Sequence, residues 1–318
     1  MEKLHVGDSF IENEIKPSFW DFKGKFDFVD KWFLMETPYP VLLITSAYLL
    51  FVLKLGPEYM KNRKRFEMKN ILLAYNAFQV CVSAVMVYWC IEYTKKVGII
   101  QRTCLTDTYE SKYELATMIQ YYFFCKLTEL LDTVLFVLRK KQNQVSFLHV
   151  YHHTMMAWNG WVFLKYEPSY WMLFLGILNC SVHVVMYTYY GLSAYPSLRK
   201  YLWWKKYITT MQLLQFGLLI IQMTINLFVN ECKPSKWTML YFYINTMLFI
   251  YLFSKFYISS YTKKDDKKTI GENYDKSNDN VTNKTEMNRK NTSGKRNGVH
   301  SSKLNIQTNG TSFEAKQK

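Results

Sequence analysis

The chain has 318 residues, of which 49% are hydrophobic and 18% aromatic, and its formal net charge is +15. A mean hydropathy of −0.13 would suit a soluble protein, but it averages an apolar, aromatic body and a polar tail. Repeated apolar windows of about 20 residues, each long enough to cross a bilayer, exclude a wholly soluble protein. The sequence therefore predicts an all-α, polytopic membrane protein.

Three regions follow from this composition. An N-terminal segment (1–27) precedes one membrane domain (28–261), and a tail (262–318) follows. The tail is rich in Asn, Lys, Ser, Thr and Gly, which cannot bury enough apolar surface to offset the entropy of ordering. We therefore expect the tail to be disordered.

The membrane domain contains seven apolar windows that we interpret as transmembrane helices. A proline at 168 ends the fourth and permits the fifth to begin, and no internal repeat is evident, which argues against inverted-repeat transporters. The predicted spans are 39–55, 70–91, 115–138, 147–165, 169–191, 207–229 and 237–258.

Lysine and arginine gather in alternate connections, between spans one and two, three and four, and five and six, and at the start of the tail. By the positive-inside rule, this predicts a lumenal N-terminus and a cytosolic C-terminus. Lys95, Lys96 and Arg102 weaken the contrast, because they lie in an alternate loop. The main basic residues are Lys61, Arg63, Lys64, Arg65, Lys69, Arg139, Lys140, Lys141, Arg199, Lys200, Lys205, Lys206, Lys263, Lys264, Lys267 and Lys268.

Two of the six cysteines, Cys104 and Cys232, then fall in lumenal loops, whereas the others lie within spans. An oxidising lumen permits a disulfide between them. Two free thiols remain the alternative, because pairing cannot be deduced from sequence.

Three imidazoles are concentrated in the fourth span. His149, His152 and His153 follow at i, i+3 and i+4, so they share one face of a helix. His183 lies in the fifth span, and only two of the six histidines lie in the polar ends. A chain that places its imidazoles in apolar segments is expected to use them.

Further polar residues lie in the third, fifth and sixth spans, where a charge is costly unless it faces a cavity and finds partners. A purely structural role, pinning helices together, is the alternative for the charged stripe. Polar faces at one depth on four spans predict a shared, water-accessible chamber. Besides the histidines, its members are Lys126, Glu129, Asp132, Asn179, Tyr187, Tyr190, Gln212 and Gln215.

Imidazoles in such a chamber have three possible roles. They can ligate a metal, since His at i and i+4 is a common ligand pair, or act as a general acid or base. They can also accept an acyl group as nucleophiles. An acyl-imidazole survives where water is kept away, which an intramembrane chamber provides.

The polar blocks resemble those of the very-long-chain fatty acid elongases, the membrane 3-ketoacyl-CoA synthases. The similarity runs in order over about residues 28 to 260. The four matching boxes are KxxELxDT at 126–133, QxxFLHxxHH at 144–153, HxxMYxYY at 183–190 and TxxQxxQF at 209–216.

This resemblance implies an endoplasmic-reticulum enzyme that condenses a long acyl-CoA with malonyl-CoA and releases CO2, CoA and a 3-ketoacyl-CoA. It implies seven helices, six of them ringed around an acyl tunnel that opens to the cytosol. No bound cofactor is expected, and the partners are the bilayer, both CoA substrates and the ketoreductase, dehydratase and enoyl reductase of the cycle. Nucleic acid is not a partner, and a homodimer is left open.

The resemblance also implies residue roles. His152 would take the acyl group from its thioester, and the carbanion formed from malonyl-CoA would then attack the acyl-imidazole. His183 would assist across the tunnel, and His149 and His153 would orient or activate His152. The charged residues Lys126, Glu129 and Asp132 would support the chamber.

Two other classes share part of this pattern. A membrane di-iron desaturase or hydroxylase also uses HxxHH boxes, but it needs more histidines than the four placed here. A seven-span receptor shares the lumenal or outside N-terminus. It would not need three imidazoles beside a Lys/Glu/Asp stripe, and its usual Asp-Arg-Tyr and Asn-Pro-x-x-Tyr signals are absent.

Overall fold

The computed structural model describes residues 20–98, 108–229 and 235–262. Helices dominate these residues, as expected for an all-α chain. The long helices are α2 (Tyr39–Leu50), continued by η1 (Phe51–Leu55) and α3 (Gly56–Met60), then α4 (Lys69–Val97), α5 (Tyr109–Leu138), α6 (Phe147–Tyr166), α7 (Trp171–Ser193), α8 (Lys205–Val229) and α9 (Lys236–Tyr257). The short elements are α1 (Asp27–Asp30), η2 (Gln142–Gln144), η3 (Pro196–Tyr201) and η4 (Ile258–Thr262).

Each predicted span coincides with one of the long helical segments, so the polytopic, helical prediction is confirmed. Length and composition alone qualify five of these segments as membrane spans: Tyr39–Met60, Lys69–Val97, Trp171–Ser193, Lys205–Val229 and Lys236–Tyr261. The remaining two, α5 and α6, are the helices that carry the charged stripe and the histidine triplet. Polar residues at these positions lower the hydropathy of helices whose length still suffices for spanning.

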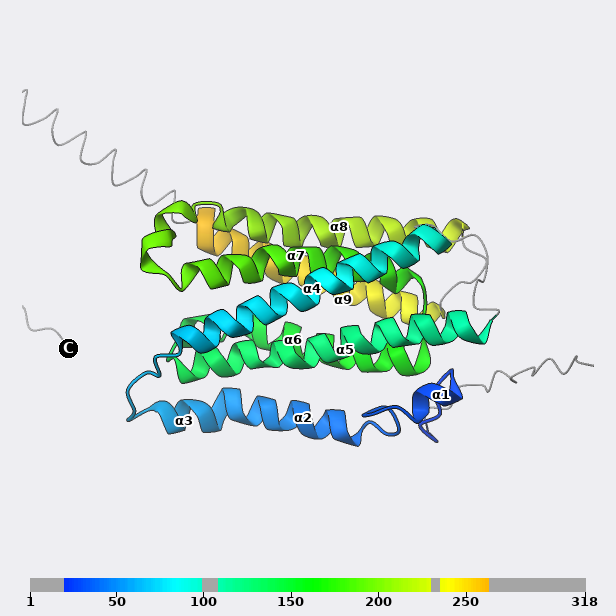
Figure 1. Cartoon of the computed structure of the whole chain (residues 1–318), viewed down its shortest axis with the longest axis horizontal. Coiled ribbons are helices and arrows are strands. Elements are labelled where there is room, and N and C mark those ends of the chain that lie inside the picture. The colour runs from blue at the N-terminus through cyan, green and yellow to red at the C-terminus, as the bar shows by residue number, and fades with distance from the viewer. Residues whose placement is uncertain (1–19, 99–107, 230–234, 263–318) are drawn as a thin grey trace, which may run out of the picture. The chain divides into compact units, whose positions relative to one another are not determined.

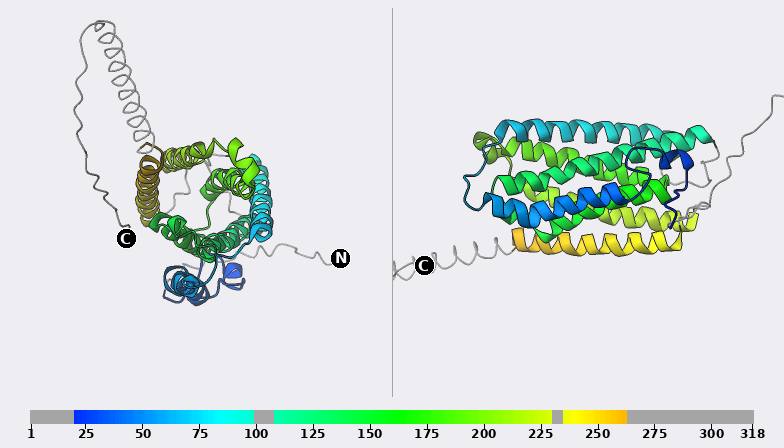
Figure 2. Two further views of the ribbon diagram at one scale, coloured as in Figure 1. Left: turned by 90° about the vertical axis from the view of Figure 1, so that its left-hand side faces the viewer. Right: turned by 90° about the horizontal axis from the view of Figure 1, so that it is seen from below.

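The helices α4, α5, α6, α9, α8 and α7 follow one another around a ring (Figure 2), and each packs against its neighbours. The α2–η1–α3 segment lies outside this ring against α5 and α6 (Figures 1 and 2). Tyr48 of α2 is joined to Thr133 of α5 by a hydrogen bond of 2.8 Å. The predicted arrangement of six ringed helices is therefore present in the structure.

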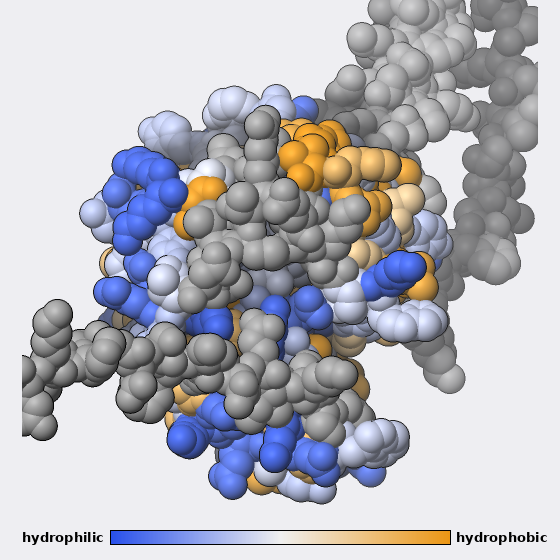
Figure 3. Space-filling view, turned by 90° about the vertical axis from the view of Figure 1, so that its right-hand side faces the viewer, coloured by the Kyte–Doolittle hydropathy of each residue, from blue (hydrophilic) through white to orange (hydrophobic). Residues whose placement is uncertain are grey.

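The two ends of the ring differ in their connections. We call one the basic end, because the lysine- and arginine-rich loops 61–68, 139–146 and 194–204 join helices there; the opposite end is the far end (Figure 1). Figure 3 looks onto the far end and shows hydrophilic patches beside hydrophobic ones.

Along the sides of the helices, large apolar side chains such as Leu43, Ile221 and Met247 are more than half exposed. Such outward apolar faces are what lipid tails would cover.

Close helix contacts shape the ring where side chains are small. At Gly160 of α6, an added Cβ would lie 3.2 Å from the Cα of Phe123 in α5. At Gly176 of α7, it would lie 3.1 Å from the Cys90 sulfur in α4. Both glycines thus let neighbouring helices approach at a distance that a larger residue would prevent.

Candidate active site

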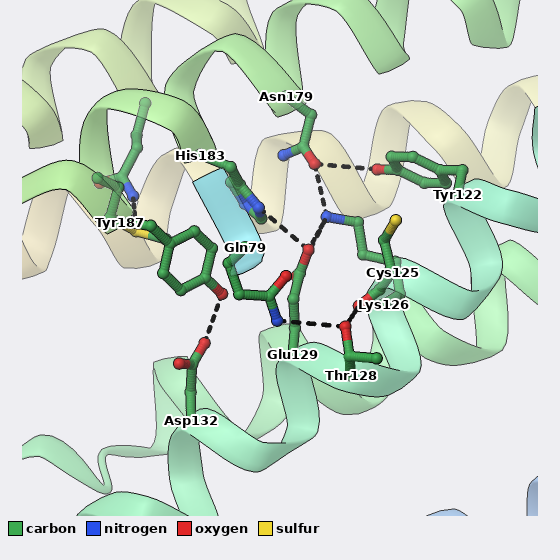
Figure 4. Close-up of polar contacts among 12 residues, drawn as sticks. Gln79, Tyr122, Cys125, Lys126, Thr128, Glu129, Asp132, Asn179, His183 and Tyr187 are labelled. Carbon is green, nitrogen blue, oxygen red and sulfur yellow. Dashed lines mark hydrogen bonds and ion pairs between the residues drawn. The ribbon is translucent and has the colours of Figure 1, made fainter. Parts of the chain in front are cut away.

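A chain of polar contacts crosses the ring interior between α5 and α7 (Figure 4). The Lys126 Nζ donates to Glu129 Oε1 at 2.8 Å and Oε2 at 3.1 Å, and to Asn179 Oδ1 at 2.7 Å. Tyr122 OH donates to the same Asn179 oxygen at 3.1 Å. Lys126 is 1% and Glu129 3% exposed, so each buried charge has its opposite directly beside it, as burial requires.

The same carboxylate also holds one of the histidines. His183 Nδ1 lies 3.1 Å from Glu129 Oε1. A ring whose Nδ1–H donates to a carboxylate carries its lone pair on Nε2, and the carboxylate fixes both its orientation and its tautomer. The structure thus brings together four predicted residues in one network: Lys126, Glu129, Asn179 and His183.

A second set of contacts surrounds this network. Tyr187 OH donates to Asp132 Oδ2 at 2.6 Å. Gln79 of α4 donates through Nε2 to Tyr75 OH at 2.9 Å and to Thr128 Oγ1 at 3.2 Å. These bonds tie α4, α5 and α7 together directly beside Glu129 (Figure 4).

The histidine triplet sits in the first two turns of α6. Ser146 caps this helix, its side chain accepting from the backbone N–H of His149 at 3.3 Å. The rings of His149 and His153 are 4.3 Å apart, and His152 packs edge-on against Phe249 at 5.2 Å. Among the described residues, His149 Nε2 and His153 Nδ1 are buried without a hydrogen-bond partner.

A cavity lined by His152 lies inside the ring. Its empty space is about 660 Å³, including its open mouth. His152 is the one histidine among its lining residues, and Gln215, whose buried Oε1 has no partner among the described residues, also faces it. The lining is Tyr122, His152, Met156, Asn159, Gly160, Phe163, Met172, Leu175, Asn179, Gln215, Phe216, Leu219, Tyr241, Phe242, Asn245, Thr246 and Phe249.

The remaining predicted residues are placed differently. Gln212 is half-buried and donates to the Met186 sulfur at 3.9 Å, and Tyr190 is 37% exposed with its ring 6.2 Å from that of Tyr187. Neither lines the cavity. Cys104 and Cys232 lie outside the described residues, so their pairing stays a prediction.

The sequence analysis did not assign several residues that the structure places at the site. Tyr122 precedes Lys126 by four residues. In α4 the half-buried Tyr75 and the buried Gln79 and Ser83 form a stripe at the same spacing. Helical periodicity could have revealed both sets. Asn159 and Tyr241, which are joined by a hydrogen bond across α6 and α9, carry no such signal, because the contact links segments far apart in sequence.

Positive charge collects at the basic end, where the three loops contain many lysines and arginines but one carboxylate, Glu67. Partial burial and the nearby charges of Arg199 and Arg65 lower the pKa of Arg139. The backbone contact from Phe66 N to Leu138 O, at 3.3 Å, brings the first of these loops against the end of α5. None of the three arginines forms an ion pair with any described residue.

No group of three or more His, Cys, Asp or Glu within residues 20–98, 108–229 and 235–262 is arranged to hold a metal ion. The Glu129 carboxylate is instead engaged by Lys126 and His183. Four histidines and two carboxylates are thus close in the ring without the geometry of a ligand cluster.

The ring and its interior define a class of protein: a polytopic helical membrane protein that encloses imidazoles, a buried ion pair and a largely apolar cavity lined by one of the imidazoles, His152. Its sequence matches the model of the ELO family, described as the GNS1/SUR4 family, over residues 33–269.

Three relatives show how far this similarity extends. The chain is 41% identical to Very long chain fatty acid elongase 7 of Rattus norvegicus, over 74% of this chain and 85% of that protein. It is 38% identical to Very long chain fatty acid elongase 2 of Mus musculus, over 86% and 92%. It is 37% identical to Very long chain fatty acid elongase 4 of Homo sapiens, over 81% and 82%. The chain belongs to the very-long-chain fatty acid elongase family, and the resemblance drawn from the four sequence boxes is confirmed.

Proposed function

We propose that this protein carries out the condensation step of elongation through an acyl group held on His152. Membership of the elongase family makes the chain a condensing enzyme of fatty acid elongation. The observation that carries the residue assignment is the position of His152. Among the described histidines, His152 alone lines the cavity, and no described side chain hydrogen-bonds to its ring.

In the first step, a lone pair of the His152 ring attacks the thioester carbon of the acyl-CoA. The carbon–sulfur bond breaks, the His152 ring loses its proton to the departing thiolate, and CoA leaves as the thiol. The acyl-imidazole formed here is shielded by the apolar walls of the cavity. The acyl chain extends along the same walls toward the far end.

In the second step, malonyl-CoA loses CO2 and the resulting enolate attacks the acyl carbonyl. A carbon–carbon bond forms, the carbon–nitrogen bond to His152 breaks, and the ring takes up one proton. The products are 3-ketoacyl-CoA, CO2 and CoA. His183 lies 3.1 Å from Glu129 through Nδ1. In its protonated form, with Nδ1–H donating to Glu129, its Nε2–H would donate to the enolate oxygen and stabilise its charge.

The neighbouring groups have supporting roles in this proposal. His153 packs edge-on against His152, with ring centroids 5.4 Å apart, and His149 packs against His153. Together they would keep the His152 ring in place. Lys126 neutralises Glu129, and Asp132 fixes α7 through Tyr187. No cofactor is needed for either step.

The basic end supplies the CoA entrance in this account. Arg139, Lys140, Lys205 and Lys206 would bind CoA phosphates, for which cationic donors are suited. The same charges serve as the positive-inside signal, which supports an endoplasmic-reticulum membrane protein with a lumenal N-terminus and a cytosolic tail. The ketoreductase, dehydratase and enoyl reductase of the cycle would take the product onward, and a homodimer is left open.

Release of CO2 tests this function. Purified protein is given a long-chain acyl-CoA and malonyl-CoA labelled in its free carboxyl group, and labelled CO2 and 3-ketoacyl-CoA are measured. We expect both products from the wild type and neither from His152→Ala. Phe147→Leu is the matched control, because Phe147 lies on the same helix but is 71% exposed. Product formation by His152→Ala at the wild-type rate would contradict the assignment.

A further inference from the structure

Gln215 of α8 is a buried amide that the two reaction steps above do not use. Its side chain lines the cavity, and only 5% of the residue is exposed. Neither its Oε1 nor its Nε2 forms a hydrogen bond with a described residue. Burying an amide without partners is unfavourable, so a ligand that supplies a partner is the expected explanation for such a group in a cavity.

Aromatic packing brings this part of α8 to the level of His152. The ring of Phe216, the next residue along α8, has its centroid 5.8 Å from that of Phe249 and 5.3 Å from that of Phe253. The His152 ring packs against the same two phenylalanines of α9, at 5.2 Å and 6.1 Å. Gln215 and His152 therefore face the cavity at about the same depth, from two different helices.

The register of α7 against α8 places His183 at this level too. The two helices follow one another in the chain and are antiparallel (Figure 1). Gln212 of α8 donates to the Met186 sulfur of α7 at 3.9 Å. Gln215 comes three residues after Gln212 and His183 three residues before Met186. Because the helices are antiparallel, both steps lead away from the basic end by about 4.5 Å.

An amide at this level supplies what acyl transfer requires. When His152 attacks a thioester, negative charge develops on the carbonyl oxygen, and hydrogen-bond donors aimed at that oxygen lower the barrier. The Nε2 of a glutamine carries two N–H donors. In the account above, His183 donates to the enolate oxygen of the malonyl-derived group, which leaves the acyl oxygen without a donor.

We propose that Gln215 is a catalytic residue whose Nε2 donates to the acyl carbonyl oxygen when His152 attacks. The oxygen becomes an oxyanion as the nitrogen–carbon bond forms, and the carbonyl returns as the carbon–sulfur bond breaks. The same oxygen is charged again when the enolate attacks the acyl-imidazole, so Gln215 acts in both steps. The inference rests on the proposed function, since it takes His152 as the nucleophile.

This assignment predicts that stability and activity respond differently to one substitution. Gln215→Met keeps the length of the side chain and removes its amide. Because no hydrogen bond within the described residues is lost, we expect an unfolding temperature equal to that of the wild type or higher. A lower unfolding temperature would mark Gln215 as a structural residue and contradict the proposal.

The kinetic test measures acylation alone. Full-length purified protein is mixed with a long-chain acyl-CoA in the absence of malonyl-CoA, quenched at successive times, and the adduct on His152 is quantified by peptide mass spectrometry. In Gln215→Met we expect single-turnover acylation to slow by about 100-fold or more. Binding of an S-alkyl-CoA, a thioether that lacks the carbonyl oxygen, should stay within about three-fold of the wild type, because the lost interaction belongs to the transition state.

Two further variants complete the design. Gln215→Leu also lacks the amide and replaces Gln215→Met if that variant does not fold. Gln222→Met is the matched control on the same helix, because Gln222 is equally buried and has an unpartnered Nε2 among the described residues but does not line the cavity. It should acylate His152 at the wild-type rate.

Several results would overturn this inference alone. They are wild-type acylation by a folded Gln215→Met or Gln215→Leu variant, an equal loss of rate in Gln222→Met, or a matching loss of S-alkyl-CoA binding. A wild-type protein that forms no adduct on His152 would instead overturn the proposed function, and this inference with it.

Discussion

Glu129 is the residue at which the charges of the site meet. It accepts from Lys126 on its own helix and pairs with His183 on α7, while only 3% of its surface is exposed. A buried carboxylate is stable only while its partners remain, and removing one partner of a buried pair is strongly destabilising. This residue therefore couples stability to the orientation of a histidine.

Replacing Glu129 by Gln should affect both stability and the orientation of His183. The variant leaves the Lys126 ammonium buried without a counter-charge, at a cost of about 3–5 kcal/mol, and it replaces the charged acceptor of His183 with a neutral amide. We expect a lower unfolding temperature and loss of condensation, measured by thermal unfolding in detergent and by product formation.

The double variant Lys126→Met/Glu129→Gln is the control for stability. It removes both charges, so it should recover most of the stability but none of the activity. A single Glu129→Gln variant with the stability and rate of the wild type would show that this network supports neither.

The sequence predicted part of this site. The stripe Lys126, Glu129, Asp132 follows from three-residue spacing on one helix, and its members do face the ring interior. The contact between Glu129 and His183 could not follow from spacing, because it depends on how α5 and α7 are placed across the ring. The family resemblance had singled out His152 from the triplet. That His152 lines the cavity and the other two do not depends on the rotation of α6.

At the scale of elements, the contact between α5 and α6 positions the triplet relative to the charged stripe. It is close because Gly160 has no side chain, so that Phe123 packs directly against the α6 backbone. The sequence predicted both helices to within a few residues, yet it did not predict this contact. The periodicity and hydropathy of a sequence indicate which residues form helices. The distance between two packed helices depends instead on the side chains where they cross.

A larger residue at the crossing should separate the helices. In Gly160→Val the added side chain meets Phe123 backbone and ring atoms at 3.2 Å and beyond, and such overpacking costs about 1–3 kcal/mol. We expect lower thermal stability and a reduced condensation rate.

Gly217→Ala provides the matched comparison on α8. An added Cβ there meets nothing within 4 Å, and alanine is favoured over glycine in a helix by about 1 kcal/mol. It should be as stable as the wild type or more so. A Gly160→Val protein that is equally stable and active would refute the close-contact account.

At the scale of the whole molecule, a buried ion pair fastens residues 20–36 to the far end of α6. Lys165 is fully buried, and its Nζ donates to Asp30 Oδ1 at 2.6 Å and to the backbone oxygens of Met35 and Glu36. The backbone N–H of Gly24 donates to both oxygens of the same Asp30 carboxylate. Sequence reasoning assigned Lys165 to the end of a span and gave it no partner, because Asp30 lies 135 residues away.

Replacing Lys165 by Met should release this segment. The Asp30 carboxylate and two backbone oxygens would lose their donor, at about 1–3 kcal/mol for each group left unsatisfied. We expect faster amide hydrogen exchange over residues 20–36, read by mass spectrometry, together with a lower unfolding temperature. Lys31→Met is the control, because Lys31 is exposed on the same segment; equal exchange in the two variants would contradict the ion-pair account.

The most direct test of the whole account is capture of the acyl group on the protein. Full-length protein is incubated with a long-chain acyl-CoA in the absence of malonyl-CoA, quenched, digested and analysed by peptide mass spectrometry. The account predicts an acyl adduct on His152, discharged on addition of malonyl-CoA and absent from His152→Ala. An adduct on another residue, or one that persists after malonyl-CoA is added, would contradict it.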